Sequence, residues 1–466
     1  MTGSGASWLT AHLATVAGTL LLVPFLARIL RDRRPPASTL AWLLSVALVP
    51  YLGVPLYLVL GPRKRGARRR KVALYPADAR SPAAPPTDQP LVARMLSADG
   101  IPSPEAGNTI ELLATGEAAF ARLMEALEAA RTSIHISTFI LGDDATGTAI
   151  LELLTRKAAA GVEVRLLLDG LFALRASGRR LRALRDAGGK VVRFAPMIHL
   201  PFRGSDNLRN HRKMVLVDGE SAIVGGMNLA EEYMGPSRLA GRWRDIALVV
   251  RGPAVQRIAE IALADWDFAA GQAASPATAV ARASGAERTG DATIQVVPSG
   301  PDSVDDTLYE ALLAACYAAS RRIWVATPYF VPDDALTRAL RSAARRGVDV
   351  RVIVPKRSNH LLADLAGGTY LRQIQAAGGR IATYPEMLHA KAIVVDGELG
   401  IVGSANFDMR SLFLDYEIAL FLYSAPEVAR LAQWFDDVVA SCGDLGRAGR
   451  ARSLGEDIGR LFAPLV

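Results

Sequence analysis

The sequence predicts an α/β protein in which two similar lobes form one shared site, preceded by a transmembrane helical hairpin. Three observations lead to this prediction. A spaced pattern of polar residues occurs twice, 178 positions apart; the text around both copies alternates between helix-like and strand-like segments; and the first 60 residues are mostly apolar. The chain has 466 residues, which is enough for two or three domains with cores of their own.

The amino-terminal segment has the composition of a membrane anchor. Trp8 to Leu30 is mostly apolar, and Leu40 to Leu60 contains 21 residues without a charge. A helix needs roughly 20 such residues to span a bilayer, and Pro50 and Pro55 are tolerated in a helix that lies in lipid. No Lys or Arg precedes the first apolar segment, which favours a helical hairpin over a cleaved signal peptide.

A basic run, RKRGARRRK at 63–71, follows the hairpin and has seven basic residues in nine, whereas the turn between the apolar segments has four. Positive residues accumulate on the cytoplasmic side of a membrane. We therefore expect the lobes, and the amino terminus with them, to lie in the cytoplasm. The basic run is either a stop-transfer signal alone or also a surface that attracts anionic lipid.

The formal net charge of +8 arises from this amino-terminal segment. Residues 1–71 contain 11 Lys and Arg and one acidic residue, so the remaining chain has 43 basic and 45 acidic residues. A nearly neutral body does not predict a nucleic-acid partner. Cys316 and Cys442 have neither disulfide nor metal-site spacing and are expected to be small buried residues. We expect no metal and no other cofactor.

Two stretches rich in Ala, Pro, Ser and Gly, 73–90 and 269–290, separate the parts of the chain. The predicted organisation is a membrane anchor with two transmembrane helices at 1–71, a linker at 72–108, a first lobe at 109–268, a linker at 269–290 and a second lobe at 291–466.

The repeated pattern reads His, x, Lys, four residues, Asp, six residues, then Gly, Gly or Ser, x, Asn. Its two copies are His211, Lys213, Asp218, Gly225, Gly226 and Asn228, and His389, Lys391, Asp396, Gly403, Ser404 and Asn406. Six positions that recur in two halves of a chain are not expected by chance. The apolar runs 214–217 and 392–395 predict short strands, in which His and Lys two residues apart point the same way.

These residue types suit displacement at phosphorus. A phosphodiester carries negative charge on its non-bridging oxygens in the transition state, and two lysines and two asparagines supply cationic and hydrogen-donating groups. The reaction also needs a nucleophile and a group that protonates the departing alkoxide. Two imidazoles on opposite sides of the phosphorus can divide these tasks, so both copies are expected in one site.

The repeat extends beyond the motif. AAGVEVRLLLDG at 159–170 parallels RRGVDVRVIVPK at 345–356, and LRDAGGKVVRFAP at 184–196 parallels IQAAGGRIATYPE at 374–386. In each half a helix-patterned stretch leads through Gly into a β-branched run, as in a layered α/β lobe. The offsets place about a dozen extra residues just before His211, in a Gly-, Ser- and Asn-containing loop at 201–210 that would overhang the site.

The chain resembles the phospholipase D superfamily, whose HxKxxxxDxxxxxxGSxN motif occurs twice, and within it the bacterial cardiolipin synthases. The text at 210–233, 241–255, 327–336 and 388–420 resembles theirs. The resemblance implies phospholipase D-like lobes, with His211, Lys213, Asp218, His389, Lys391 and Asp396 as catalytic residues and Asn228, Ser404 and Asn406 as substrate-binding residues. Gly226 departs from the generic motif, which leaves Ser404 as the motif's one hydroxyl.

Two acidic residues on strand-like runs are candidates to hold the second nitrogen of each catalytic imidazole. Glu417 lies 28 residues after His389, and the resemblance implies that it supports this histidine. Asp245 lies 34 residues after His211 and is the corresponding candidate there, although its spacing differs by six. The alternative is a solvated surface role for either acid.

The resemblance implies phosphatidyl transfer between two molecules of phosphatidylglycerol, with release of glycerol, by a multi-pass protein of the bacterial inner (cell) membrane. His211 is expected to be the nucleophile, and His389 the general acid and then the base. Three alternatives stay open. Water could be the acceptor, which would make the protein a hydrolase of phospholipid or, as a lesser alternative, of nucleic acid; another alcohol could be the acceptor; or the protein could be a non-catalytic membrane scaffold.

Overall fold

The computed structural model describes residues 36–60, 71, 74–75, 89–173, 175–194, 208–273, 287–303, 306–461 and 463, with part of 23–31. The chain forms two compact units, one made of Met1–Arg69 with Ile198–Asn207 and the other of Arg70–Met197 with Leu208–Val466. Both predicted lobes belong to the second unit. The loop predicted at 201–210 lies outside the described residues except for its last three positions.

In the first unit, the uncharged run that the sequence predicts as one helix forms two helices, α2 (Pro36–Leu48) and α3 (Pro50–Leu60). The rings of Trp42 and Tyr57 lie 5.4 Å apart, whereas one continuous helix would separate these positions by about 22 Å. Pro50 cannot donate a helical hydrogen bond and restricts the residue before it, so the chain reverses there. Gly53 permits the close approach, since a Cβ would lie 2.3 Å from the Ser45 carbonyl oxygen.

No helix of the described residues has both the length and the apolar character needed to cross a membrane. Most of the predicted first span, Trp8 to Leu30, and the basic run up to residue 70 lie outside the described residues.

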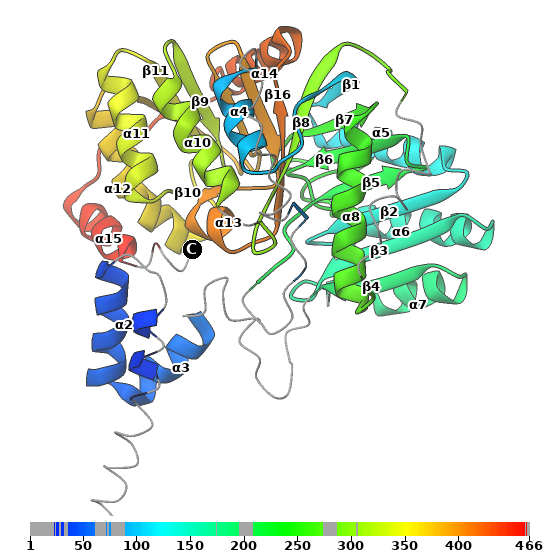
Figure 1. The fold of residues 1–466 in the computed structure, drawn as a ribbon, viewed down its shortest axis with the longest axis horizontal. Helices are drawn as coiled ribbons and strands as arrows, with labels where there is room; N and C mark the ends of the chain where they lie inside the picture. The colour runs from blue at the N-terminus through cyan, green and yellow to red at the C-terminus, as the bar shows by residue number, and fades with distance from the viewer. Residues whose placement is uncertain are drawn as a thin grey trace, which may run out of the picture. The chain divides into compact units, whose positions relative to one another are not determined.

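The lobes share a continuous sheet of 15 strands and have the same internal strand order, except that the second lobe adds β17 at its edge. Figure 1 shows the strands β1 and β8, where the two halves of the sheet meet. The first lobe has the order β1-β7-β6-β5-β2-β3-β4, and the second has β8-β16-β14-β13-β9-β11-β12-β17. The two halves meet where β1 pairs antiparallel with β8. This confirms the two similar α/β lobes.

The first-lobe strands are β1 (Glu105–Leu113), β2 (Ser133–Thr138), β3 (Glu163–Asp169), β4 (Lys190–Phe194), β5 (Met214–Val217), β6 (Ser221–Gly225) and β7 (Ala247–Arg251). The second lobe has β8 (Ala292–Ser299), β9 (Arg322–Ala326), β11 (Asp349–Pro355), β12 (Arg380–Tyr384), β13 (Ala392–Val395), β14 (Leu399–Gly403), β16 (Glu417–Leu422) and β17 (Gly443–Asp444). A separate two-stranded sheet pairs β10 (Phe330–Val331) with β15 (Phe407–Asp408).

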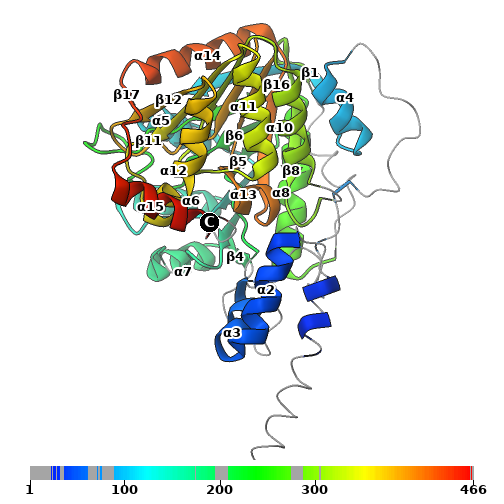
Figure 2. The same cartoon turned by 90° about the vertical axis from the view of Figure 1, so that its left-hand side faces the viewer.

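Helices cover both faces of the sheet because successive strand residues point in opposite directions. On β5, Val215 and Val217 pack in the core beneath α5, α6 and α7, whereas Met214 and Leu216 pack in the core that includes α8. In the second lobe, α10, α11 and α12 lie side by side in both views (Figures 1 and 2).

The helices of the lobes are α4 (Leu91–Ala98), α5 (Gly116–Ala129), α6 (Ala145–Ala159), α7 (Gly178–Asp186), α8 (Ala254–Ala270), α10 (Thr307–Ala318), α11 (Asp334–Arg345), α12 (Leu361–Ala376), α13 (Met409–Phe413), α14 (Ala425–Val439) and α15 (Arg450–Arg460).

The predicted domain boundaries stay predictions, and regular structure extends into both predicted linkers. Helix α4 and the start of β1 lie within 72–108, and α8 continues to Ala270. Residues 274–286 of the second linker lie outside the described residues.

The motif aspartates, Asp218 and Asp396, occupy equivalent turns at the far ends of β5 and β13, seven residues after the histidines. An extended segment of that length spans about 20 Å. The Asp218 carboxylate accepts the backbone N–H groups of Arg131, Thr132 and Ser133 at 2.8–2.9 Å. Asp396 accepts those of residues 320–322 at 2.7–3.0 Å. Each carboxylate thus holds the turn that leads into the neighbouring strand, and we propose that the role of both aspartates is structural rather than the expected catalytic one.

We predict that Asp396→Ala lowers the free energy of unfolding by about 1–3 kcal/mol, since it leaves three backbone donors without their acceptor. The folded fraction should keep its turnover on a soluble phosphodiester. Thermal unfolding and activity per folded molecule measure the two effects, with Glu398→Ala, an exposed acid two residues away, as the control. A large loss of turnover at unchanged stability would show that Asp396 acts in the reaction.

Candidate active site

Each His-x-Lys pair lies just before an equivalent strand, β5 or β13, and its side chains are almost completely buried. The Phe139 ring contacts both partners of the first pair, with its centre 4.8 Å from the His211 ring and 5.4 Å from the Lys213 amine. In the second pair, Lys391 Nζ lies within 3.1 Å of both ring nitrogens of His389. The predicted common orientation of His and Lys is confirmed.

Backbone hydrogen bonds join each histidine to the opposite lobe. The His211 N–H donates to the Tyr416 carbonyl at 2.9 Å, and the Tyr416 N–H donates to the Arg209 carbonyl at 2.8 Å. The counterpart is the His389 N–H, which donates to the Arg244 carbonyl at 2.7 Å. Each histidine is thus fixed beside the segment that carries the other lobe's acidic residue.

The histidine–carboxylate pairs therefore cross between the lobes. His211 Nδ1 lies 2.8 Å from Glu417 Oε1, and His389 Nδ1 lies 2.6 Å from Asp245 Oδ2. The expected partners, Glu417 for His389 and Asp245 for His211, were wrong, because each acid points across the lobe boundary rather than back toward its own motif. When Nδ1 donates its proton to the carboxylate, the lone pair of Nε2 is left for chemistry.

Asp245 and Glu417 occupy equivalent positions despite their different spacing from the histidines. Gly225 pairs with Ala247 between β6 and β7, and Gly403 pairs with Ala419 between β14 and β16. Each acid lies two residues before the paired alanine. The six extra residues of the first lobe therefore fall between β6 and Asp245 and do not displace the carboxylate.

Gly226 departs from the generic motif because Asp245 occupies the space that a side chain would need. A Cβ at position 226 would lie 2.3 Å from Asp245 Oδ1. In the second lobe, the hydroxyl of Ser404 instead donates to Glu417 Oε2 at 2.5 Å. Ser404 thus lies behind the Glu417 carboxylate that holds His211 and fixes the position of that carboxylate.

Three aromatic residues that sequence reasoning missed surround the imidazoles. Phe139 contacts His211, as described above, while the rings of Tyr233 and Trp243 lie 4.9 and 5.4 Å from that of His389. Tyr233 and Trp243 lie between β6 and Asp245, in the segment where the first lobe has six more residues than the second. Because the two lobes differ in length over this segment, a search for positions repeated in both halves of the sequence does not find Tyr233 and Trp243.

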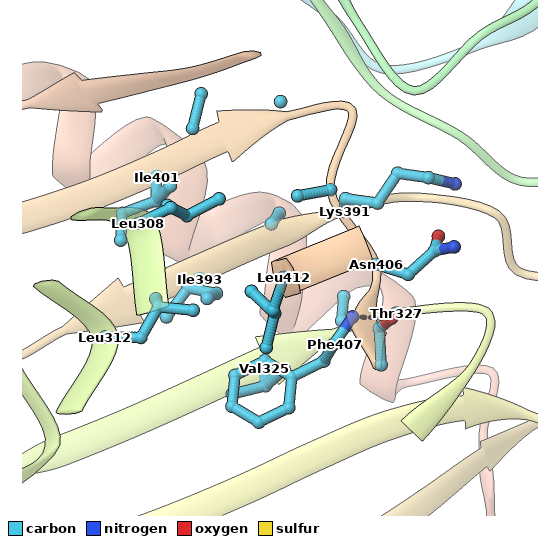
Figure 3. Close-up of a pocket in the computed structure, with 15 residues that line it drawn as sticks. Leu308, Leu312, Val325, Thr327, Lys391, Ile393, Ile401, Asn406, Phe407 and Leu412 are labelled. Carbon is cyan, nitrogen blue, oxygen red and sulfur yellow. Dashed lines mark hydrogen bonds between the residues drawn. The ribbon is translucent and has the colours of Figure 1, made fainter. Parts of the chain in front are cut away.

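The motif asparagines are both buried. Asn228 is buried, and its Oδ1 accepts the Ile140 N–H at 3.1 Å, while its side chain also hydrogen-bonds Tyr233. Lys391 and Asn406 extend toward the same side of an apolar cavity between β9, β13 and α10 (Figure 3). A matching cavity lies behind Lys213 in the first lobe. Both lysine stems thus pass through apolar surroundings before the amine reaches the site.

Burial dominates the electrostatics of the site. The pKa of His211 is lowered to about 4 and that of His389 to about 3, chiefly by desolvation, with the adjacent lysines acting in the same direction and the carboxylates opposing the shift. Desolvation also lowers the pKa of Lys213 to about 8 and that of Lys391 to about 7. Both imidazoles are therefore neutral at pH 7. A bound anion would raise all four values because it favours the charged forms.

No group of three or more His, Cys, Asp or Glu side chains among the described residues is arranged to hold a metal ion.

Comparison with known proteins identifies the family. The family model described as "Cardiolipin synthase, PLD-like domain" matches residues 123–266 and 312–439. A cardiolipin synthase of Geobacillus thermodenitrificans is 34% identical over 93% of this chain and 90% of its own length. The chain belongs to the phospholipase D-type cardiolipin synthase family. A second cardiolipin synthase, from Bacillus anthracis, is 33% identical over 93% of this chain and 88% of its own length.

Two further matches extend the family assignment. The family model described as "Phospholipase_D-nuclease N-terminal" matches residues 20–62, in the amino-terminal unit. The crystal structure of a phosphatidylserine synthase from Haemophilus influenzae superposes with a TM-score of 0.60 and covers 79% of this chain and 96% of its own. Its sequence is 15% identical, so it shows the common fold of the paired lobes.

We predict that kcat/KM falls as the pH rises through about 7 to 8, because Lys391 and then Lys213 lose the charge that stabilises the phosphoryl oxygens. A lysine is cationic below its pKa, so the loss lies on the alkaline side. An arginine does not titrate in this range. In Lys391→Arg, the residual kcat/KM should therefore begin to fall at a pH about one unit higher than in the wild type, because only Lys213 still titrates. An identical limb in this variant would assign the titration to another group.

Proposed function

We propose that the protein is a cardiolipin synthase that transfers a phosphatidyl group from one phosphatidylglycerol to another through a phosphatidyl-histidine. One observation carries the proposal: two neutral imidazoles, each held by a carboxylate from the opposite lobe, lie with two lysines in one buried site. The family relationship over nearly the whole chain identifies the reaction class.

In the first half-reaction, Nε2 of His211 attacks the phosphorus of phosphatidylglycerol. The bond from phosphorus to the oxygen of the terminal glycerol breaks, and His389 in its protonated form gives a proton to that oxygen, which releases glycerol. His389 must take up a proton for this step. Burial lowers the pKa of this residue, and the bound phosphodiester anion supplies the negative charge that favours protonation.

In the second half-reaction, a glycerol hydroxyl of another phosphatidylglycerol attacks the phosphorus. His389, now neutral, accepts the hydroxyl proton, and the bond from phosphorus to Nε2 of His211 breaks. Cardiolipin and the free imidazole are the products. The carboxylate of Glu417 stabilises the charge that His211 acquires while it carries the phosphatidyl group, and Asp245 does the same for protonated His389.

The charge on the non-bridging oxygens is stabilised by Lys213, Lys391, Asn228 and Asn406. Loss of one preorganised donor of this kind typically reduces turnover by roughly 100-fold or more. These four side chains supply the stabilisation without a cofactor in this proposal.

The competing function is hydrolysis, in which water replaces the second lipid at the same intermediate. Purified full-length enzyme with labelled phosphatidylglycerol, alone and with glycerol or phosphatidylethanolamine, separates the alternatives through its lipid products. Cardiolipin with one glycerol released per turnover supports the synthase. Phosphatidic acid as the main product under all conditions would establish a hydrolase, and a product found only with an added acceptor would identify a different alcohol. Turnover of single-stranded nucleic acid in place of lipid would identify a nuclease.

We further propose that residues 1–71 anchor the lobes at the cytoplasmic face of the bacterial inner membrane. The uncharged run, the seven basic residues that follow it and the amino-terminal family match at 20–62 support this. Protease added to intact spheroplasts should leave the lobes uncut, and protease added to inverted vesicles should digest them. The reverse pattern would place the lobes on the outer side.

We predict that His389→Ala accumulates a covalent adduct on His211 with an activated phosphodiester, whose nitrophenolate leaving group needs no proton. Without the base at 389 the adduct should persist. Rapid quench into alkali, which preserves phosphohistidine, followed by peptide mass analysis, locates the label. Adduct found on His389 in the wild type would reverse the two roles, and no adduct in any variant would reject the covalent mechanism.

The crossed pairing gives a separate expectation for the two acids. Glu417→Gln should slow formation of the His211 adduct by roughly 100-fold, because it removes the carboxylate that supports the nucleophile. Asp245→Asn should leave adduct formation from the activated diester nearly unchanged and slow its breakdown, because Asp245 supports the base. Slow adduct formation in Asp245→Asn, with slow adduct breakdown in Glu417→Gln, would contradict the crossed pairs.

A further inference from the structure

The residue that ends the basic run is a buried lysine that contacts both lobes. Lys71, the last residue of that run, has a side chain that is 2% exposed. Its Nζ lies 2.5 Å from Asp265 Oδ1 and 2.5 Å from Asp302 Oδ2. Asp265 belongs to α8, and Asp302 follows β8. Leu74 and Tyr75, three and four residues on, are half-buried against the hydrophobic cores.

The same two carboxylates hold Arg212, the residue between the catalytic His211 and Lys213. Arg212 is fully buried, with Nη1 2.6 Å from Asp265 Oδ1 and Nη2 3.3 Å from Asp302 Oδ2. Since alternate residues of an extended segment point in opposite directions, Arg212 faces away from the site while its neighbours face into it. Its Nε also donates to the Glu417 carbonyl at 2.8 Å, and Glu417 is the partner of His211.

The cluster of Lys71, Arg212, Asp265 and Asp302 is buried and electrically balanced, with two cations and two carboxylates. Asn210 completes it, because its amide donates to Asp265 Oδ2 at 3.1 Å and its Oδ1 accepts the Arg212 N–H at 3.0 Å. Loss of Lys71 would leave one buried carboxylate charge uncompensated directly behind His211. A buried charge that loses its partner is strongly unfavourable, so the cluster would have to rearrange around Arg212.

We propose that Lys71 is a positioning residue for the nucleophile, and that through it the end of the anchor segment sets the geometry of His211. This proposal rests on the proposed role of His211. Lys71 holds Asp265 and Asp302 where they orient Arg212, and Arg212 fixes both the backbone between His211 and Lys213 and the backbone of Glu417. Attachment of the amino-terminal segment and reactivity of the histidine are therefore coupled within one buried cluster.

Lys71→Met in the full-length protein tests the proposal through two readouts. The first is the rate of adduct formation on His211 with an activated soluble phosphodiester, measured in the His389→Ala background. The second is binding to vesicles of phosphatidylglycerol and phosphatidylcholine. We expect adduct formation to slow by about tenfold or more while vesicle binding changes less than twofold. Lys190→Met, which removes an exposed lysine paired with Glu163, is the control and should change neither.

A second variant keeps the test decisive if Lys71→Met folds poorly. Lys71→Met with Asp302→Asn removes one cation and one anion and restores the balance, so it should regain most of the stability and of the adduct rate. Lys71→Arg should also retain most of the rate. Unchanged adduct formation in Lys71→Met would overturn the proposal, as would failure of the balanced double variant to recover. Because the readout needs no lipid acceptor, a wild type that forms the adduct but makes no cardiolipin would reject the proposed synthase function alone.

Discussion

The exchange of carboxylates between the lobes is the constraint on which the rest of the site depends. Glu417 of the second lobe holds His211, and Asp245 of the first lobe holds His389. Each exchange is fixed by backbone hydrogen bonds between the histidine segment and the opposite acid segment. Neither lobe can therefore orient its own imidazole alone, which explains in physical terms why the motif must occur twice in one chain.

Burial sets the protonation states of the site and also disfavours the charged groups that the reaction needs. Removal of the imidazoles and lysines from water favours their neutral forms, which suits a nucleophile but weakens the cationic groups that must meet a phosphodiester. The substrate's own negative charge reverses this effect when it binds. The site is thus matched to an anion that brings the missing charge, and its fully charged form is expected only with the substrate in place.

The repeat made the lobes, the strand before each His-x-Lys pair and the common orientation of its side chains predictable, because periodicity and spacing are local properties. The carboxylate partner of each histidine was not predictable. Glu417 lies nearer to His389 in sequence, but its side chain contacts His211 of the other lobe. The position of Asp218 and Asp396, at the strand ends away from the histidines, was not predictable because the motif gives spacing without showing which end of a strand each residue occupies. Composition likewise could not show that the run around Pro50 forms two helices.

The stereochemical course at phosphorus tests most directly the claim that two histidines act in turn through a covalent intermediate. A phosphatidylglycerol made chiral at phosphorus with sulfur and oxygen isotopes would be converted by the enzyme, and the configuration of the product determined. Two successive in-line displacements, first by His211 and then by the acceptor hydroxyl, predict overall retention. Inversion would mean direct attack by the acceptor, with no phosphatidyl-histidine, and would contradict the account.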